Sequence, residues 1–247
     1  MIRRSLIVLA AAFVTAGTAL ADTIRVGVAS NFLGPATDIA SAFETATGHT
    51  VLLSAGSTGK LYGQIVAGAP YDVFLAADTA RPKALIDKGF AVSGSQRTYA
   101  IGTLVLWSAR GDVPVTLSRL RAGSYRHLAI AQPTLAPYGR AAIETLSALA
   151  LTDRTADRLV FGESISQAMS FVATGNAELG FVAKAQVVAL SGQAPGHYWQ
   201  VPAELHRPIE QAGVIVRSDK PAAAEFFEYL RSPVAHDILT RYGYRSP

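Results

Sequence analysis

The chain has 247 residues, of which half are hydrophobic, 16% are charged and 9% are aromatic. This composition is typical of a well-packed globular protein of one large or two small domains, and it excludes a disordered chain. Cysteine is absent, which excludes disulfides and thiolate chemistry, and the basic residues behind the net charge of +4 are scattered, so nothing indicates a nucleic-acid partner.

Residues 1–21 predict a cleaved signal peptide. Arg3 and Arg4 precede an apolar run from Leu6 to Val14, and Ala19-Leu20-Ala21 forms a small-x-small cleavage pattern. We therefore expect an exported, periplasmic protein whose mature chain begins near Asp22 and carries a net charge of about +2, from 20 basic and 18 acidic residues. The alternative is an uncleaved N-terminal anchor, but the apolar run is short for a membrane span.

From Thr23 onward, strand patterns alternate with helix patterns. The first set contains strands at 24–30, 50–55 and 71–77 and helices that start at Pro35, that carry Leu61, Tyr62 and Ile65, and that span 80–88. After a long extended segment at 98–109, the second set contains strands at 127–131, 158–162 and 178–183 and helices at 138–149, 165–174 and 184–190. An extended run at 210–217 and two helices at 221–230 and 234–242 complete the chain.

Two such sets predict an α/β fold of two lobes, each a mostly parallel sheet flanked by helices. The long extended segments are expected to connect the lobes. We assign residues 22–100 and 207–247 to lobe I and residues 101–206 to lobe II. The ligand would lie in the cleft between the lobes, at the carboxyl ends of the strands.

The loop SAGSTGK at 54–60 combines glycines, hydroxyls and a lysine, as phosphate-binding loops do. A P-loop needs G-x-x-x-x-G-K-[ST], whereas Ser54 occupies the first glycine position and Leu61 follows Lys60. Neither Ser57 nor Ser164 lies in a G-x-S-x-G elbow, although a secreted serine hydrolase that uses one of them stays open as an alternative. We interpret Ser57 as a helix N-cap and Lys60 as a solvated surface charge.

Four loops share the pattern of a strand end followed by a helix start: Ser30-Asn31, Ser57, 137–139 and 164–167. The last is a Ser-x-x-Gln capping box, which puts the N–H of Ile165 in the unbonded first turn. One such loop alone is simply a capped helix. Four converging starts, each equivalent to about half a positive charge, would offer roughly two positive charges to a dianion.

Neutral donors of this kind suit a fully ionised oxyanion, because such a ligand carries no proton that needs an acceptor. A protonated anion would need a carboxylate beside it, and none stands at the expected contact positions. Asp78 and Glu163 are close in sequence to these loops and leave the point open.

Five stretches carry a family pattern: VASNF (28–32), SAGSTGKLYGQIVAGAPYDVFLAAD (54–78), AQPTLAPYGRAA (131–142), GNAELGFVAKAQV (175–187) and RYGY (241–244). They resemble the periplasmic molybdate- and tungstate-binding proteins of ABC transporters, the ModA family, over essentially the whole mature chain. The resemblance implies a type II-like periplasmic binding protein without catalytic activity, which closes on a tetrahedral oxyanion and delivers it to a membrane permease. It also implies a monomer that has no cofactor and coordinates no metal directly.

The resemblance also assigns oxyanion-binding residues. Ser30 and Asn31 match the first serine site, and Ser57 matches the second with its hydroxyl and backbone N–H. Tyr138 matches a position that donates through its backbone, and Ile165 stands where the family has a small apolar residue that donates its N–H.

The chain departs from the family pattern at Ala183, where many members have a tyrosine whose hydroxyl reaches the oxyanion. Asn31 and the side chain of Tyr138 are candidate replacements for this donor. The choice between molybdate, tungstate and another tetrahedral anion such as sulfate or thiosulfate therefore stays open. Because these ions share one hydrogen-bonding geometry, cavity size must discriminate between them, and a misfit leaves donors unpaired at about 1–3 kcal/mol each.

Overall fold

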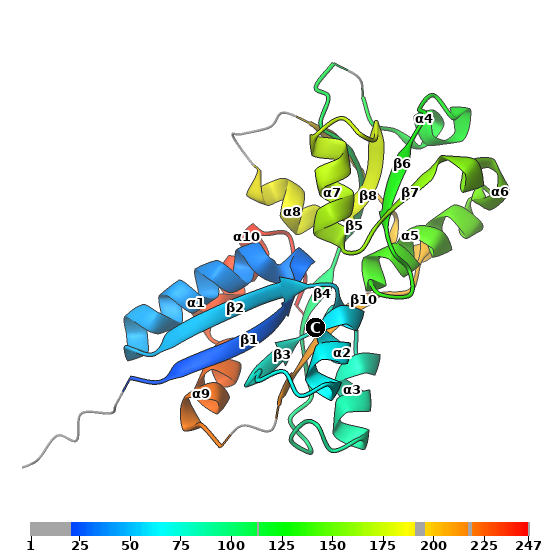
Figure 1. Cartoon of the computed structure of the whole chain (residues 1–247). Helices are drawn as coiled ribbons and strands as arrows, with labels where there is room; N and C mark the ends of the chain where they lie inside the picture. Colours follow the sequence, from blue (N-terminus) through cyan, green and yellow to red (C-terminus); the bar gives the residue numbers. More distant parts are fainter. Residues whose placement is uncertain (1–20, 113, 191–195, 217–218, 247) are drawn as a thin grey trace, which may run out of the picture.

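The computed structural model describes residues 21–112, 114–190, 196–216 and 219–246. It has two lobes, each built on a five-stranded sheet (Figure 1). The expected signal peptide lies outside the described residues apart from Ala21, as does Arg217 at the end of the expected strand 210–217. Within the described residues, no helix has the length and apolar character needed to cross a membrane.

The first sheet has the strand order β2-β1-β3-β10-β4 and the second the order β7-β6-β8-β5-β9. The strands of the first sheet are β1 (Thr23–Ala29), β2 (Thr50–Gly56), β3 (Val73–Leu75), β4 (Arg97–Gly102) and β10 (Ile209–Ile215). Those of the second sheet are β5 (Leu104–Ser108), β6 (Leu128–Ala131), β7 (Leu159–Gly162), β8 (Leu179–Ala183) and β9 (His197–Gln200).

The two sheets share one pattern of pairing. In the first, β2 and β3 pair in parallel with β1, and β10 is antiparallel to β3 and β4. In the second, β7 and β8 pair in parallel with β6, and β5 is antiparallel to β8 and β9. The reversed strand of each sheet is the one by which the chain enters from the other lobe. The predicted fold of two α/β lobes is thus confirmed.

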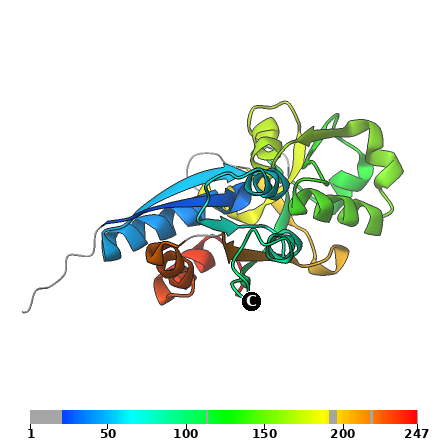
Figure 2. The ribbon, with the colours of Figure 1, turned by 60° about the horizontal axis from the view of Figure 1, so that its bottom comes forward.

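Helices cover both lobes, which Figure 2 shows with the first lobe (blue and red) on the left and the second (green) on the right. The helices of the first lobe are η1 (Ser30–Phe32), α1 (Leu33–Thr47), α2 (Thr58–Val66), α3 (Ala80–Asp87), α9 (Pro221–Tyr229) and α10 (Pro233–Arg241). Those of the second are α4 (Leu117–Ala122), α5 (Pro137–Ala148), α6 (Thr152–Thr155), η2 (Ala156–Arg158), α7 (Ile165–Ala173), α8 (Lys184–Ala189) and η3 (Ala203–Leu205).

The first sheet buries both of its faces. Val73 and Leu75 of β3 belong to one core cluster with residues of α1, α9 and α10, whereas Phe74 between them belongs to another cluster with residues of α2 and α3. This alternation follows from the two-residue period of a strand. Burial on both faces explains why β3 reads as a continuous apolar run.

The expected extended segment 98–109 is not one strand but two. β4 ends at Gly102 in the first sheet and β5 begins at Leu104 in the second, so the chain crosses between the lobes at Thr103. A Cβ at Gly102 would lie only 2.1 Å from the hydroxyl oxygen of Tyr138, so glycine is needed there for close approach. The return crossing is made by residues 201–208, between β9 and β10.

Several local features differ from the sequence prediction: β3 covers only Val73–Leu75 of the strand expected at 71–77, and the short helix α6 was not predicted. The helix predicted from Pro35 starts earlier, because the 3-10 turn η1 leads directly into α1 at Leu33. The helix α4 has six residues, too few for a periodic apolar pattern to reveal it. The strand β9 is held at the sheet edge by β5 alone, and its short sequence HYWQ gave no strand signal.

Candidate functional site

Two of the predicted site residues lie at the carboxyl edge of the first sheet. The parallel register of β1 and β2 pairs Ala29 with Gly56, so Ser30 and Ser57, which follow these residues, leave the sheet beside each other. Ser57 is the N-cap of α2, and its Oγ accepts a hydrogen bond from the backbone N–H of Lys60 at 3.4 Å. The predicted N-cap is confirmed, and the first N–H groups of α2 have no partner within the helix.

The second lobe provides two further helix starts. α5 begins with a proline at its first position, and the N–H of Tyr138 follows in the first turn. α7 begins at Ile165 and is capped by Ser164, whose Oγ accepts from the N–H of Gln167 at 3.2 Å. The expected capping box is only half formed, because Gln167 Oε1 accepts from the N–H of Glu163 at 2.6 Å, one residue before the N-cap.

Ser30, Asn31, Ser57, Tyr138 and Ile165 line one small pocket between the lobes. The cavity is small, with a volume of about 10 Å³; the empty space among its lining residues, open solvent included, is about 190 Å³. Its other lining residues are small, apolar or hydroxylic: Ala29, Gly56, Thr58, Ala77, Ala136 and Pro137. Within the described part of the chain, the lining therefore contains no charged side chain, and a ligand there meets hydroxyls, backbone amides and helix N-termini.

Sequence reasoning missed Thr58 as a residue of this lining. Its Oγ1 accepts a hydrogen bond from the backbone N–H of Ala77 at 3.1 Å, which ties the start of α2 to the chain that follows β3. The feature of the sequence that could have indicated Thr58 is its hydroxyl, which directly follows that of Ser57.

The side chain of Ser30 has an unusual environment. Its Oγ is buried and has no hydrogen-bond partner among the described residues, a state that costs about 1–3 kcal/mol for a buried polar group. The backbone carbonyl of Ser30 accepts from Ser166 Oγ at 3.3 Å, and Ser166 Oγ accepts in turn from Gln186 Nε2 at 2.9 Å. Ser30 is thus held from the second lobe while its hydroxyl is left to donate to a ligand.

The side chains of Asn31 and Tyr138 take part in a buried network instead. Asn31 Nδ2 donates to Gln211 Oε1 at 2.8 Å and to Tyr244 Oη at 3.0 Å, and Tyr138 Oη accepts from Gln211 Nε2 at 3.3 Å. Both N–H groups of the Asn31 carboxamide are engaged in this network, so they are not free to supply the donor missing at Ala183. Tyr138 Oη accepts a hydrogen bond here, and Tyr138 stays a candidate for that donor. Both residues also offer a ligand the backbone N–H at a helix start.

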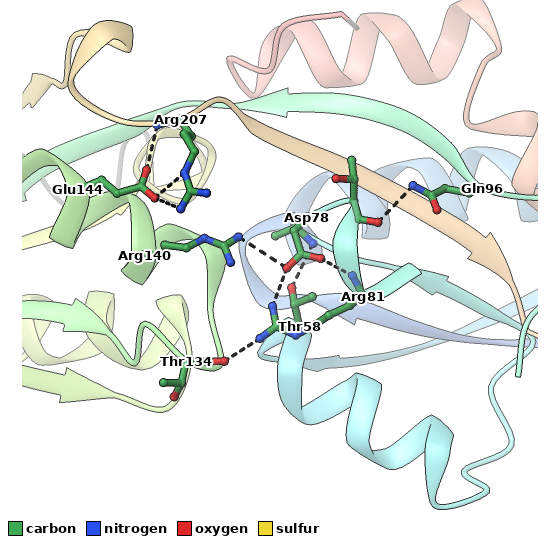
Figure 3. A network of polar contacts seen from close by, with 10 residues as sticks. Thr58, Asp78, Arg81, Gln96, Thr134, Arg140, Glu144 and Arg207 are labelled. Carbon is green, nitrogen blue, oxygen red and sulfur yellow. Dashed lines mark hydrogen bonds and ion pairs between the residues drawn. The ribbon is translucent and has the colours of Figure 1, made fainter. Parts of the chain in front are cut away.

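None of the charged residues in the network around Asp78 lines the pocket. Figure 3 shows this network, with Asp78 next to the pocket residue Thr58. Asp78 Oδ2 lies 2.5 Å from Arg81 Nη1 and 3.8 Å from Arg140 Nη2, so this nearly buried carboxylate faces two guanidinium groups. Arg81 also donates through Nη2 to the carbonyl oxygen of Thr134 in the second lobe, at 2.6 Å. Asp78 is therefore committed to arginines and does not line the pocket as an acceptor for a ligand proton.

Further contacts cross the cleft and hold the lobes closed. The backbone N–H of Gly59 donates to the carbonyl of Leu135 at 2.8 Å. Lys60 Nζ lies 3.3 Å from Glu163 Oε2, with both side chains largely exposed. Neither Lys60 nor Glu163 lines the small pocket, so the lysine of SAGSTGK contacts a surface carboxylate of the other lobe.

The arrangement lacks the parts of a serine hydrolase. Ser57 and Ser164 both act as helix caps, and none of the five histidines, all of which are described, lines the pocket. An activated serine needs a base within hydrogen-bond reach. Among the described residues there is also no group of three or more histidine, aspartate or glutamate side chains that could hold a metal ion.

Comparison with known proteins identifies the family. A family model described as bacterial extracellular solute-binding protein matches residues 24–245. The chain is 48% identical over 242 residues to the molybdate-binding protein ModA of Azotobacter vinelandii, covering 97% of this chain and 96% of that protein. The chain belongs to the ModA family of bacterial extracellular solute-binding proteins. ModA of Rhodobacter capsulatus is 43% identical over 228 residues, covering 92% of this chain and 89% of that protein.

The fold agrees with this assignment to the ModA family. The solved structure of the periplasmic molybdate-binding protein of A. vinelandii matches with a TM-score of 0.87 at 42% identity, covering 91% of this chain and 99% of that chain. The family resemblance seen in the sequence is therefore confirmed, as is the two-lobed binding-protein fold. ModA-family proteins act in transport rather than catalysis, so the hydrolase alternative is not favoured.

Proposed function

We propose that this ModA-family chain is a periplasmic binding protein that captures molybdate and delivers it to the permease of an ABC transporter. The relatives from A. vinelandii and R. capsulatus are named molybdate-binding proteins, and both align over most of the chain. We further propose that it binds tungstate, which has the same charge and tetrahedral geometry, that it is a monomer exported with residues 1–21 removed, and that it uses no cofactor besides the bound anion.

The chemistry of the small pocket carries the proposal. Ser30 brings a buried hydroxyl without a partner, and Ser57, Tyr138 and Ile165 stand at or beside the starts of α2, α5 and α7. Each helix start acts as roughly half a positive charge, so several of them balance a dianion without any lysine or arginine. A lining without carboxylates among the described residues also favours the fully ionised form of the ligand.

Closure of the lobes would couple binding to transport. An anion bonded to Ser30 in the first lobe and to the N–H groups of Tyr138 and Ile165 in the second binds the closed form better than an open one, and so shifts the population toward closure. The contacts Gly59–Leu135 and Ser166–Ser30 join the two lobes and can form only when the lobes are closed. The closed form is the one expected to dock on the permease.

The test is calorimetric titration of residues 22–247 with molybdate, tungstate and sulfate in turn. We expect tight binding of one molybdate or tungstate per chain and negligible binding of sulfate. If none of the three anions binds, the proposal is overturned. If sulfate binds more tightly than molybdate, sulfate and not molybdate is the ligand.

A further inference from the structure

Gln211 is a fully buried polar residue that does not line the pocket. It lies on β10, where the pairing with β4 shifts register between Gln211 and Ala212, and irregularities of this kind re-aim side chains. Its Oε1 accepts from Asn31 Nδ2 at 2.8 Å and from Tyr99 Oη at 3.3 Å, while its Nε2 donates to Tyr138 Oη at 3.3 Å. One carboxamide thus bonds to three residues.

Tyr244 joins the same network from the end of the chain. Its hydroxyl accepts from Asn31 Nδ2 and donates to the Asn31 carbonyl, both at 3.0 Å. The next residue, Arg245, exchanges backbone hydrogen bonds with Ile101 of β4, which fixes this end of the chain beside the first sheet. The RYGY ending thereby reaches the loop that lines the pocket.

The network lies where the chain crosses between the lobes. A Cβ on Gly102 would stand 2.1 Å from Tyr138 Oη and 2.8 Å from Gln211 Nε2, so this glycine makes room for both groups. Asn31 belongs to the first lobe and Tyr138 to the second, and both line the pocket. Gln211 therefore bonds to one pocket residue of each lobe.

The hydroxyls of this network keep their protons over the physiological pH range. Burial raises the pKa of Tyr244 to about 12 and raises the pKa values of Tyr99 and Tyr138 well above the usual 10.0. The same donors and acceptors are therefore present whenever the pocket binds its ligand. A buried network whose donors and acceptors are all paired holds its residues rigidly, whereas an unpaired polar group in it would destabilise the fold.

We propose that Gln211 is a positioning residue for oxyanion binding. Without touching the anion, its carboxamide fixes the separation between Asn31 and Tyr138, so that the backbone donors of both lobes converge on one tetrahedral ion. The inference rests on the function proposed for the pocket. A hydrocarbon side chain at position 211 would leave polar atoms of Asn31 and Tyr138 without partners, and the two helix starts would lose their common anchor.

The test compares Gln211→Met with Thr155→Val. The first removes the carboxamide at similar side-chain volume, and the second removes a buried hydroxyl that donates to the carbonyl of Leu151 at 2.9 Å and does not line the pocket. Melting temperature without ligand and molybdate affinity by calorimetry are measured for both variants and the parent. We expect both variants to melt earlier, but only Gln211→Met to bind molybdate about tenfold more weakly, which equals about 1.4 kcal/mol.

A second set of variants shows whether Gln211 acts through its partners. The affinity losses of Gln211→Met and Tyr138→Phe are expected not to add fully, because both variants remove the hydrogen bond between Gln211 Nε2 and Tyr138 Oη. Should Gln211→Met fail to fold, Tyr244→Phe removes the hydroxyl that makes two hydrogen bonds to Asn31. It is expected to weaken molybdate binding about threefold or more, because the loss of a single neutral hydrogen bond already has an effect of that size.

Unchanged affinity in these variants, or equal losses in Gln211→Met and Thr155→Val, would overturn the inference and leave the proposed function intact. A parent protein that binds none of molybdate, tungstate or sulfate would overturn the proposed function, and this inference with it.

Discussion

Removal of the Ser30 hydroxyl separates ligand binding from stability. In the closed structure its Oγ is buried without a partner among the described residues, so in the absence of ligand Ser30→Ala removes no hydrogen bond of that atom. We expect the free energy of unfolding without ligand not to fall, and to rise by up to about 1–3 kcal/mol, which is what the unpaired hydroxyl costs. With molybdate bound, the hydroxyl donates to a charged oxygen, and hydrogen bonds of that kind contribute about 1.5–3 kcal/mol. The dissociation constant should therefore rise about 10- to 100-fold.

The assay is calorimetry with molybdate together with thermal melts with and without it. Ser164→Ala is the matched control, because Ser164 caps α7 but does not line the pocket. Loss of such a cap costs about 0.5–2 kcal/mol, so this variant should melt earlier and bind molybdate with a smaller loss than Ser30→Ala. The reasoning is refuted if Ser30→Ala binds molybdate as tightly as the parent. It is also refuted if the variant melts earlier without ligand and its loss of affinity is no larger than this loss of stability accounts for.

Three other measurements test separate parts of the account. Ala183→Tyr adds a ring at a fully buried position, where overpacking costs about 1–3 kcal/mol. The melting temperature and the molybdate affinity of this variant should both fall, and tighter molybdate binding would contradict this expectation. Lys60→Ala breaks an exposed ion pair with Glu163 and should change molybdate binding by less than about 1 kcal/mol, and a greater loss would give Lys60 a direct role. Unfolded tyrosine loses its proton near pH 10, whereas Tyr244 in the folded protein does so near pH 12. The free energy of unfolding should therefore be constant below about pH 10 and fall as the pH approaches 12, and this fall should be less steep in Tyr244→Phe. Identical alkaline melting curves for the parent and Tyr244→Phe would contradict the raised pKa of Tyr244.

Local patterns made much of the fold and site readable from the sequence. Ser57 and Ser164 follow strands and precede apolar helical faces, and both are N-caps in the structure. Because parallel strands end at the same sheet edge, residues after β1 and β2 come together without any contact that a sequence would have to reveal. This is why five residues chosen from four loops line one pocket.

Contacts between distant segments were beyond such reasoning. Asn31 bonds to Gln211 and Tyr244, which lie 180 and 213 positions away, and no local pattern links them. The split of the extended segment 98–109 was missed for the same reason, since the need for Gly102 comes from the hydroxyl of Tyr138 in the other lobe. The sequence also offered the side chains of Asn31 and Tyr138 as ligand donors, whereas in the structure both N–H groups of Asn31 are taken up by Gln211 and Tyr244, and Tyr138 Oη accepts from Gln211.

The central claim is that the small pocket between the lobes holds the anion through neutral donors. A crystal structure grown with molybdate, with diffraction recorded at the molybdenum absorption edge, tests it most directly. The account predicts one anomalous peak in the pocket lined by Ser30, Ser57 and Ile165, with Ser30 Oγ at hydrogen-bond distance, about 2.5–3.0 Å, from an oxygen of the anion. A peak held instead by arginine or lysine side chains outside this pocket, or by a protonated carboxylate, would contradict it.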